Sequence, residues 1–403
     1  MHTHLETLLP RHRLKRLLLT LTMLAALLTG RAMSQDSICL SLLTCGPGEE
    51  IYSLFGHTAL RYECPAKGID WVYNYGVFSF DTPNFVLRFC LGETDYRLGR
   101  MHFQHFLEEY RYRGREVWQQ ELNLKPEEKR RLVEQLETNY RPENRVYRYN
   151  FFYDNCATRP RDQVERCVEG SVAYAEEMES TDTGVTFRDL LREHTEGHPW
   201  ARFGINLCLG SKADVPISRR EMMFAPYYVK DFFQRASIKQ GSDEELTRPL
   251  VCPAQQLLPT VKRGEESGYG TTPMMLVCLL LAVVATVTFC EMKYKKRWWG
   301  VDFVLLTAAG ITGFILAFLT FLSQHPAVCP NYQLFLFHPL HLLALPAIVW
   351  SGIKGRKCRY MQANFIVLTL FILLWPLIPQ KIDLTVLPLA LCLWIRSMSY
   401  IKK

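Results

Sequence analysis

The fold of this chain is best approached from YNFFYDNCATRPRD, the stretch from Tyr149 to Asp162. Its aromatic run is typical of a buried strand that ends at Asp154-Asn155, and Cys156 follows at once, before a polar run that favours a helix. A helix N-terminus carries a partial positive charge and free backbone N–H groups, and both favour a thiolate. The pattern therefore predicts a nucleophilic cysteine with a lowered pKa. The alternative is a small buried side chain, which is common for free cysteine.

The helix after Cys156 contains an irregularity at Pro160. Proline has no N–H to donate within a helix, although it is well tolerated in a first turn. We therefore expect a short tight turn after Cys156 and a restart of the helix at Pro160.

A cysteine nucleophile needs a base, and the best candidate is His57 in YSLFGHTALRY. The residues after His57 alternate between apolar and polar, which predicts a half-buried strand, and Gly56 indicates a bulge or a close backbone approach. A second strand, DWVYNYGVFSF, carries Asn74, which could orient the imidazole as the third member of a triad. His57 could instead be a core histidine. Its rivals as a base are His102, His105, His194 and His198.

The N-terminus has the layout of a secretory signal peptide. Basic residues precede an apolar run, Leu17–Leu28, that is too short to span a bilayer comfortably, and Ala32-Met33-Ser34 forms a plausible cleavage site. We expect a signal peptide over residues 1–34, with an uncleaved anchor as the alternative. Either arrangement exports the residues that follow.

Residues 35–236 have the mixed pattern of one exported α+β domain. Pro126 and the two glutamates after it predict the start of a helix that runs to about Asn139. The amphipathic stretch Ser218–Ala236 is expected to pack on the domain rather than lie on a membrane. Polar residues with Pro and Gly over 237–270 predict a linker. The strands are expected near Ile38–Leu43, Thr58–Tyr62, Trp71–Phe80, Glu116–Leu124 and Val146–Phe152.

Residues 271–403 form a different region, in which apolar runs predict about five transmembrane helices. The loops at 291–300 and 354–359 and the C-terminal tail are basic, whereas the alternate connections, 323–332 and 378–383, carry almost no Lys or Arg. Basic loops face the cytoplasm, so residue 270 is placed outside, which agrees with an export signal. The expected helices are Pro273–Cys290, Val301–Leu322, Leu334–Trp350, Phe365–Leu377 and Leu384–Ile395.

Several functional classes are disfavoured by the sequence. Eight cysteines fall in the exported part, yet none has the C-x-x-C spacing of a zinc site and no H-E-x-x-H is present, so we predict neither a metal nor a cofactor. The net charge of +7 is explained largely by the basic loops and gives no reason to expect nucleic acid as a partner. Disulfides are possible in an oxidising compartment, but their pairing stays open.

The outer loop after the second membrane helix is rich in polar side chains: His325, Asn331, His338 and His341 are expected at or near the outer face. Polar groups at this depth often serve function, although histidine at an interface is also ordinary.

These motifs resemble two related groups of proteins. An early strand histidine and a later Asn155-Cys156 resemble the permuted papain-like group that includes lecithin:retinol acyltransferase. SLFGHTALR, VYNYGVF, YNFFYDNCATRPRD and the outer-loop HPAVCPNYQLFLFHPL are similar to the Lnb-type lipoprotein N-acyltransferases of Bacteroides-like bacteria, as is the order of an exported domain before several membrane helices. The resemblance covers nearly all of the chain after the signal.

The resemblance implies N-acylation of the diacylglyceryl-cysteine of lipoproteins, with a membrane phospholipid as the acyl donor and a diacylated lipoprotein as the acceptor. It implies Cys156 as nucleophile and His57 as base, whereas Asn74 as third member rests on our geometric argument alone. It also implies a multi-pass protein of the bacterial inner membrane with its catalytic domain in the periplasm. The alternatives are a membrane-tethered cysteine peptidase or amidase acting on cell wall, and a non-catalytic membrane scaffold.

Overall fold

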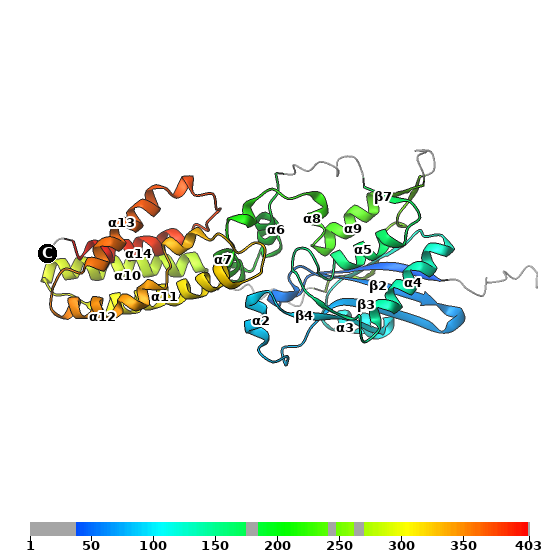
Figure 1. The fold of residues 1–403 in the computed structure, drawn as a ribbon, viewed down its shortest axis with the longest axis horizontal. Coiled ribbons are helices and arrows are strands. Elements are labelled where there is room, and N and C mark those ends of the chain that lie inside the picture. Colours follow the sequence, from blue (N-terminus) through cyan, green and yellow to red (C-terminus); the bar gives the residue numbers. More distant parts are fainter. Residues whose placement is uncertain (1–37, 175–183, 241–246, 262–269, 402–403) are drawn as a thin grey trace, which may run out of the picture.

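The computed structural model describes residues 38–174, 184–240, 247–261 and 270–401. The predicted signal peptide, residues 1–34, lies outside these ranges. A sheet-rich domain stands at one end of the elongated molecule and a bundle of membrane helices at the other (Figure 1). The expectation of an α+β domain followed by a helical membrane domain is confirmed.

Seven antiparallel strands of the described chain form the main sheet, in the order β10-β5-β1-β2-β3-β4-β6. The register places Cys45 of β1 opposite His57 on one side and opposite Val117 on the other. One end of β5, of β1 and of β2 therefore lies at the same end of the sheet, along the strand direction. The strands are β1 Cys39–Cys45, β2 His57–Cys64, β3 Ile69–Val77, β4 Asp95–His102, β5 Val117–Glu121, β6 Val146–Arg148 and β10 Gln255–Leu258.

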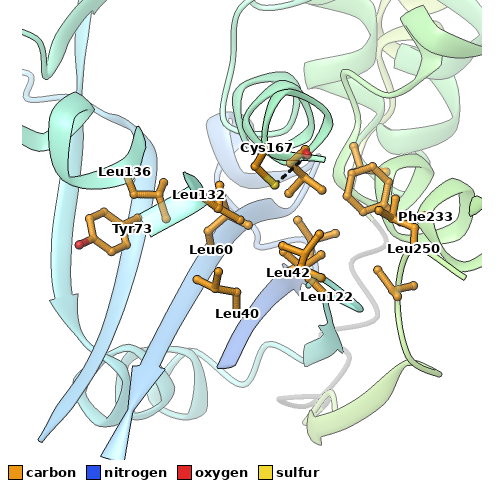
Figure 2. Close-up of a cluster of buried hydrophobic side chains, with 14 of the residues drawn as sticks. Leu40, Leu42, Leu60, Tyr73, Leu122, Leu132, Leu136, Cys167, Phe233 and Leu250 are labelled. Atoms are coloured by element: carbon orange, nitrogen blue, oxygen red, sulfur yellow. Dashed lines mark hydrogen bonds between the residues drawn. The ribbon is translucent and has the colours of Figure 1, made fainter. Parts of the chain in front are cut away.

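Helices cover both faces of this sheet. On one face lie α4 (Pro126–Tyr140), α5 (Thr158–Cys167) and α9 (Pro226–Arg235), and on the other lies α3 (Phe103–Tyr112). Figure 2 shows the first of these interfaces, where leucines of β1 and β2 meet α4, α5 and α9. Each leucine buried there stabilises the fold by roughly 1.5–3 kcal/mol. The residues labelled in that view are Leu40, Leu42, Leu60, Tyr73, Leu122, Leu132, Leu136, Cys167, Phe233 and Leu250.

The structure differs from the sequence-based expectation around the quoted stretch. Strand β6 ends at Arg148, and the next residues form a turn in which Asn150 and Asp154 exchange backbone hydrogen bonds. The turn is favoured because the Asn150 side chain accepts bonds from the N–H groups of Phe152 and Tyr153. Strand β4 and a short helix, α2 (Phe85–Leu91), were not anticipated.

The described part of the range predicted as a linker, 237–270, contains three strands. β8 (Ser237–Lys239) and β9 (Thr247–Pro249) form a small sheet with β7 (Ser171–Ala173), while β10 pairs with β5 at the edge of the main sheet. We infer that the domain continues to at least Leu258. The stretch 218–236 packs on the domain as expected, as α8 (Arg219–Met222) and α9.

The membrane domain contains five apolar helices within the described residues. By length and composition, three segments suffice to cross a membrane: Pro273–Tyr294, Trp299–Leu322 and Tyr332–Ile353. The remaining two, α13 and α14, are shorter apolar helices, so five crossings remain a prediction. The helices are α10 Pro273–Tyr294, α11 Trp299–Leu322, α12 Leu340–Ile353, α13 Arg359–Leu373 and α14 Val386–Met398.

The junction between the domains is built from α6 (Phe187–His194), α7 (Pro199–Cys208) and the turn that follows them. The N–H of Gly210 donates to the carbonyl of Ala327 at 2.9 Å, and the amide of Gln380 donates to the carbonyl of Leu209 at 2.9 Å. Both connections predicted to be outer, 323–332 and 378–383, therefore contact the sheet-rich domain and lie on its side of the membrane helices.

Candidate active site

The three residues predicted as catalytic, His57, Asn74 and Cys156, line one cavity of about 1450 Å³. The cavity lies at the end of the sheet where β1 ends and where β2 and β5 begin. It continues from there toward the membrane domain. The structure thus brings together side chains that lie far apart in the sequence.

His57 begins β2 and Asn74 lies on the neighbouring strand β3. The His57 Nε2 atom is 3.1 Å from the Oδ1 atom of Asn74. An amide oxygen can only accept a hydrogen bond, so Nε2 carries the proton and donates it. The Nδ1 atom of neutral His57 then keeps a free lone pair, which is the group a general base needs.

Cys156 is held by the residue before it. The buried Asn155 side chain accepts bonds from the N–H groups of Ala157 and Thr158 at 2.8 and 2.9 Å, and donates to the carbonyls of Phe151 and Phe224. Every hydrogen-bonding group of this amide is therefore used. The network holds the backbone on both sides of Cys156 and so sets the direction of its Cα–Cβ bond.

The helix that follows differs from expectation. It runs from Thr158 to Cys167 without a break at Pro160, and Ala157 is its cap. Pro160 falls in the first turn, where the missing N–H costs little. Cys156 precedes the cap, so its thiol does not belong to the helix itself.

Two glycines allow the close approach on which this site depends. Gly56 has a φ of +83°, and a Cβ there would lie 2.5 Å from the carbonyl oxygen of Cys45. The predicted close backbone approach beside His57 is thus confirmed. Gly76 of β3, with a φ of +89°, packs less tightly against Cys156, whose Cβ would lie 3.2 Å from an added Cβ. Other residues rarely adopt such a φ.

The resting protonation states differ from the expected thiolate. Burial raises the pKa of the Cys156 thiol to about 11, although the N–H groups of Thr58 and Cys156 itself and the charge of Arg115 act to lower it. Burial likewise lowers the pKa of His57 to about 4, against the hydrogen bond with Asn74, which raises it. Both groups are therefore neutral near pH 7, because desolvation outweighs the hydrogen bonds and, for Cys156, the charge of Arg115.

Arg115 is a cation at this site that no sequence motif singled out. Two of its N–H groups donate to the carbonyl of Gly46, with Nε at 2.8 Å, and the guanidinium lies 4.9 Å from the ring of Tyr110. It lines the cavity, and no carboxylate among the described residues pairs with it. Its charge acts to lower the pKa of both Cys156 and His57, as a smaller effect beside burial.

The other histidines considered lie elsewhere, with one exception. His102, His105, His194 and His198 do not line the cavity, whereas His325 of the outer loop does. Its Nε2 atom lies 2.7 Å from the carbonyl of Phe89 in α2. Asn331 is buried and donates to the carbonyl of Leu207, and His338 and His341 stack on each other inside the membrane domain.

Comparison with protein families accounts for most of the chain. A family profile described as the Lnb N-terminal periplasmic domain matches residues 29–193, and a second, the Lnb transmembrane domain, matches residues 264–403. The chain belongs to the Lnb family. The periplasmic Lnb profile includes all three candidate residues, and the transmembrane Lnb profile includes α10 to α14. No curated protein and no solved structure matches this Lnb chain.

Proposed function

We propose that this chain is a lipoprotein N-acyltransferase. It moves an acyl chain from a membrane phospholipid, through a thioester on Cys156, to the α-amino group of the diacylglyceryl-cysteine at a lipoprotein's N-terminus. Membership of the Lnb family supports an acyltransferase, and the geometry around Cys156 supports the thioester route.

In the first half-reaction, His57 takes the thiol proton as the sulfur of Cys156 attacks the ester carbonyl of the phospholipid. With a thiol pKa of about 11, only about one molecule in ten thousand holds a free thiolate at pH 7, so proton transfer accompanies attack. The C–O bond breaks, and the protonated imidazole gives its proton to the departing lysophospholipid oxygen. A thioester and a neutral His57 remain.

In the second half-reaction, the α-amino group of the lipoprotein attacks the thioester. Its pKa near 8 leaves a useful neutral fraction at pH 7. The C–S bond breaks, an amide forms, and the proton released by the amine returns through His57 to the sulfur. The enzyme is regenerated without any metal or redox partner.

The observation that carries this proposal is the course of the cavity. It extends from Cys156 to Ile315 and Leu319 of the membrane helix α11, and its walls between these points are largely aromatic and aliphatic. Leu322 ends α11, so Ile315 lies about 10 Å below the outer end of that helix. A site of this shape suits an acyl chain.

The decisive experiment replaces the nucleophile and the base in cells that lack another N-acyltransferase. Cys156→Ala and His57→Ala should each leave lipoproteins diacylated, and mass spectrometry of the wild-type enzyme with phospholipid should find an acyl group on Cys156. Cys252→Ala is the matched control, because that cysteine is exposed and lies outside the cavity.

Triacylated lipoprotein from the Cys156→Ala strain would rule the proposal out. Hydrolysis of peptidoglycan by the wild-type enzyme, lost in Cys156→Ala, would favour the cysteine peptidase or amidase instead.

A further inference from the structure

Helix α2 is attached to the outer end of a membrane helix. The N–H of Gln324, two residues beyond α11, donates to the carbonyl of Leu91 at 2.8 Å, and the Gln324 side chain donates to Glu93 at 3.0 Å. His325 contacts Phe89, as described above. Figure 1 shows α2 at the end of the domain that faces the membrane bundle. These contacts place α2 at the level of the bilayer surface.

The outer face of α2 is apolar and exposed. Val86 and Leu87 expose 71% and 52% of their surface, and Phe80 and Phe89 are also exposed. Leu87 lies outside the cavity, whereas Phe80, Val86 and Phe89 also line it. Large apolar side chains grouped in this way favour contact with a membrane over contact with water. Because α2 continues the surface of α11, which is itself membrane-spanning, the bilayer is the occupant that fits this face.

The inner face of α2 leads to the nucleophile through stacked aromatic rings. The ring centroids of Phe85 and Phe78 are 5.5 Å apart, those of Phe78 and Tyr96 are 5.0 Å apart, and those of Tyr96 and Tyr149 are 4.0 Å apart. Tyr149 and Cys156 both line the cavity, so the last ring of the series lies in the same wall as the nucleophile. A continuous apolar wall thus connects α2 with the thiol.

Three elements border the cavity at the membrane end. Phe89 and Cys90 come from α2, Ile205 from α7, and Ile315 and Leu319 from α11. We propose that α2 lies in the outer surface of the bilayer and that acyl chains enter the cavity sideways from the bilayer, between α2 and α11. This inference rests on the proposed function, and it names a lipid acyl chain as the ligand of the Phe89–Ile315 portion of the cavity. Lateral entry spares the chain an unfavourable passage through water.

The position of α2 can be tested with a photoreactive side chain in the full-length enzyme. We would introduce benzoylphenylalanine at Leu87 and reconstitute the protein in vesicles of phosphatidylethanolamine and phosphatidylglycerol. Illumination should attach phospholipid at position 87. The matched control is Lys67, which is exposed in the turn after β2, at the end of that strand far from His57. Equal labelling at the two positions would overturn the placement of α2.

The route itself can be tested by narrowing the cavity wall at Ile315. Ile315 and Ile311 lie one turn apart on α11 and expose 50% and 51% of their surface, but only Ile315 lines the cavity. We would measure acylation of Cys156 from a long-chain phospholipid in vesicles and from a soluble short-chain ester. Ile315→Trp should lower the ratio of the long-chain rate to the short-chain rate about tenfold. Ile311→Trp should leave that ratio unchanged.

Each outcome of this experiment bears on a definite claim. An unchanged ratio in Ile315→Trp, or the same fall in Ile311→Trp, would overturn lateral entry while leaving the thioester chemistry intact. Failure of the wild-type enzyme to acylate Cys156 from either donor would instead overturn the proposed function, and lateral entry with it. If Ile315→Trp does not fold, crosslinking at Leu87 still decides where α2 lies.

Discussion

Gly76 packs against the nucleophile so closely that a Cβ at this position would lie 3.2 Å from the Cβ of Cys156. The backbone at Gly76 also has a φ of +89°, which side chains disfavour. Strand β3 and the Cys156 turn therefore meet without an intervening side chain. Since Asn74 lies two residues earlier on β3, the same strand positions both the nucleophile and the partner of the base.

We expect Gly76→Ala to displace Cys156 and to slow its acylation by about tenfold or more, because a misplacement of about 1 Å can cost a hundredfold in rate. The positive φ should also lower the free energy of unfolding by about 1–3 kcal/mol. The measurements are the rate of acyl-enzyme formation by mass spectrometry and the melting temperature.

Gly68→Ala separates these two effects. Gly68 has a φ of +62°, but a Cβ added to it would have no neighbouring atom within 4 Å, so the substitution introduces backbone strain without a clash. We expect a comparable loss of stability and a normal rate of acylation. A similar loss of rate in both variants would show that Gly76 does not position Cys156.

The sequence predicted the hairpin that carries His57 and Asn74, but neither the environment of the candidate site nor the presence of Arg115 in it. The alternation after His57 and the strand around Asn74 predicted a hairpin, and the structure pairs these strands. Hairpin neighbours can be inferred because local alternation and a short turn determine which residues lie side by side. The contact between Asn74 and His57 follows from that local pairing.

The features that the sequence did not predict depend on contacts between residues far apart in the chain. The raised pKa of Cys156 results from burial by segments far away in the chain, so a local pattern that favoured a thiolate indicated the wrong sign. The strand at Val146–Phe152 was predicted too long, because the aromatic residues at 149–152 fill clusters around the site rather than continue β6 beyond Arg148. Helix α2, with seven residues, is too short for a periodic pattern to reveal it.

Asn74 is expected to control the base through one hydrogen bond. Burial lowers the pKa of His57 and the contact with Asn74 opposes it, so Asn74→Ala should lower that pKa further and move the acid limb of the acylation rate profile to lower pH. The maximal rate should fall by about tenfold or more because the tautomer is no longer fixed. Asn74→Asp should move the limb the other way, since a carboxylate stabilises the imidazolium. Identical profiles for both variants would contradict this role.

Arg115 is expected to assist formation of the thiolate. Its positive charge acts to lower the pKa of Cys156 and of His57, so removing the charge in Arg115→Gln should raise both values. The pH dependence of Cys156 alkylation by iodoacetamide should then shift to higher pH, and Arg115→Lys should retain most of the wild-type profile. An unshifted profile in Arg115→Gln would leave Arg115 with only its structural bond to the carbonyl of Gly46.

Asn155 is expected to be the residue on which the local fold of the site depends most. Asn155→Ala leaves the carbonyls of Phe151 and Phe224 and two N–H groups without their partner, which should lower the free energy of unfolding by about 2–5 kcal/mol. Asn155→Asp keeps the accepting oxygen but loses both donors. Its second oxygen would face the carbonyls of Phe151 and Phe224, and this pairing of acceptors in a buried site should destabilise the turn at least as much as Asn155→Ala.

The matched control for Asn155 is Asn144→Ala. Asn144 is exposed and donates a single bond to the carbonyl of Thr138, so we expect a change of about 0.5 kcal/mol or less. Thermal unfolding measures the stability of each variant, and the rate of Cys156 acylation reports whether the thiol is still correctly placed. If Asn155→Ala melts like the wild type and acylates at the same rate, the Cys156 turn must be held by its aromatic neighbours Phe151 and Phe152 instead.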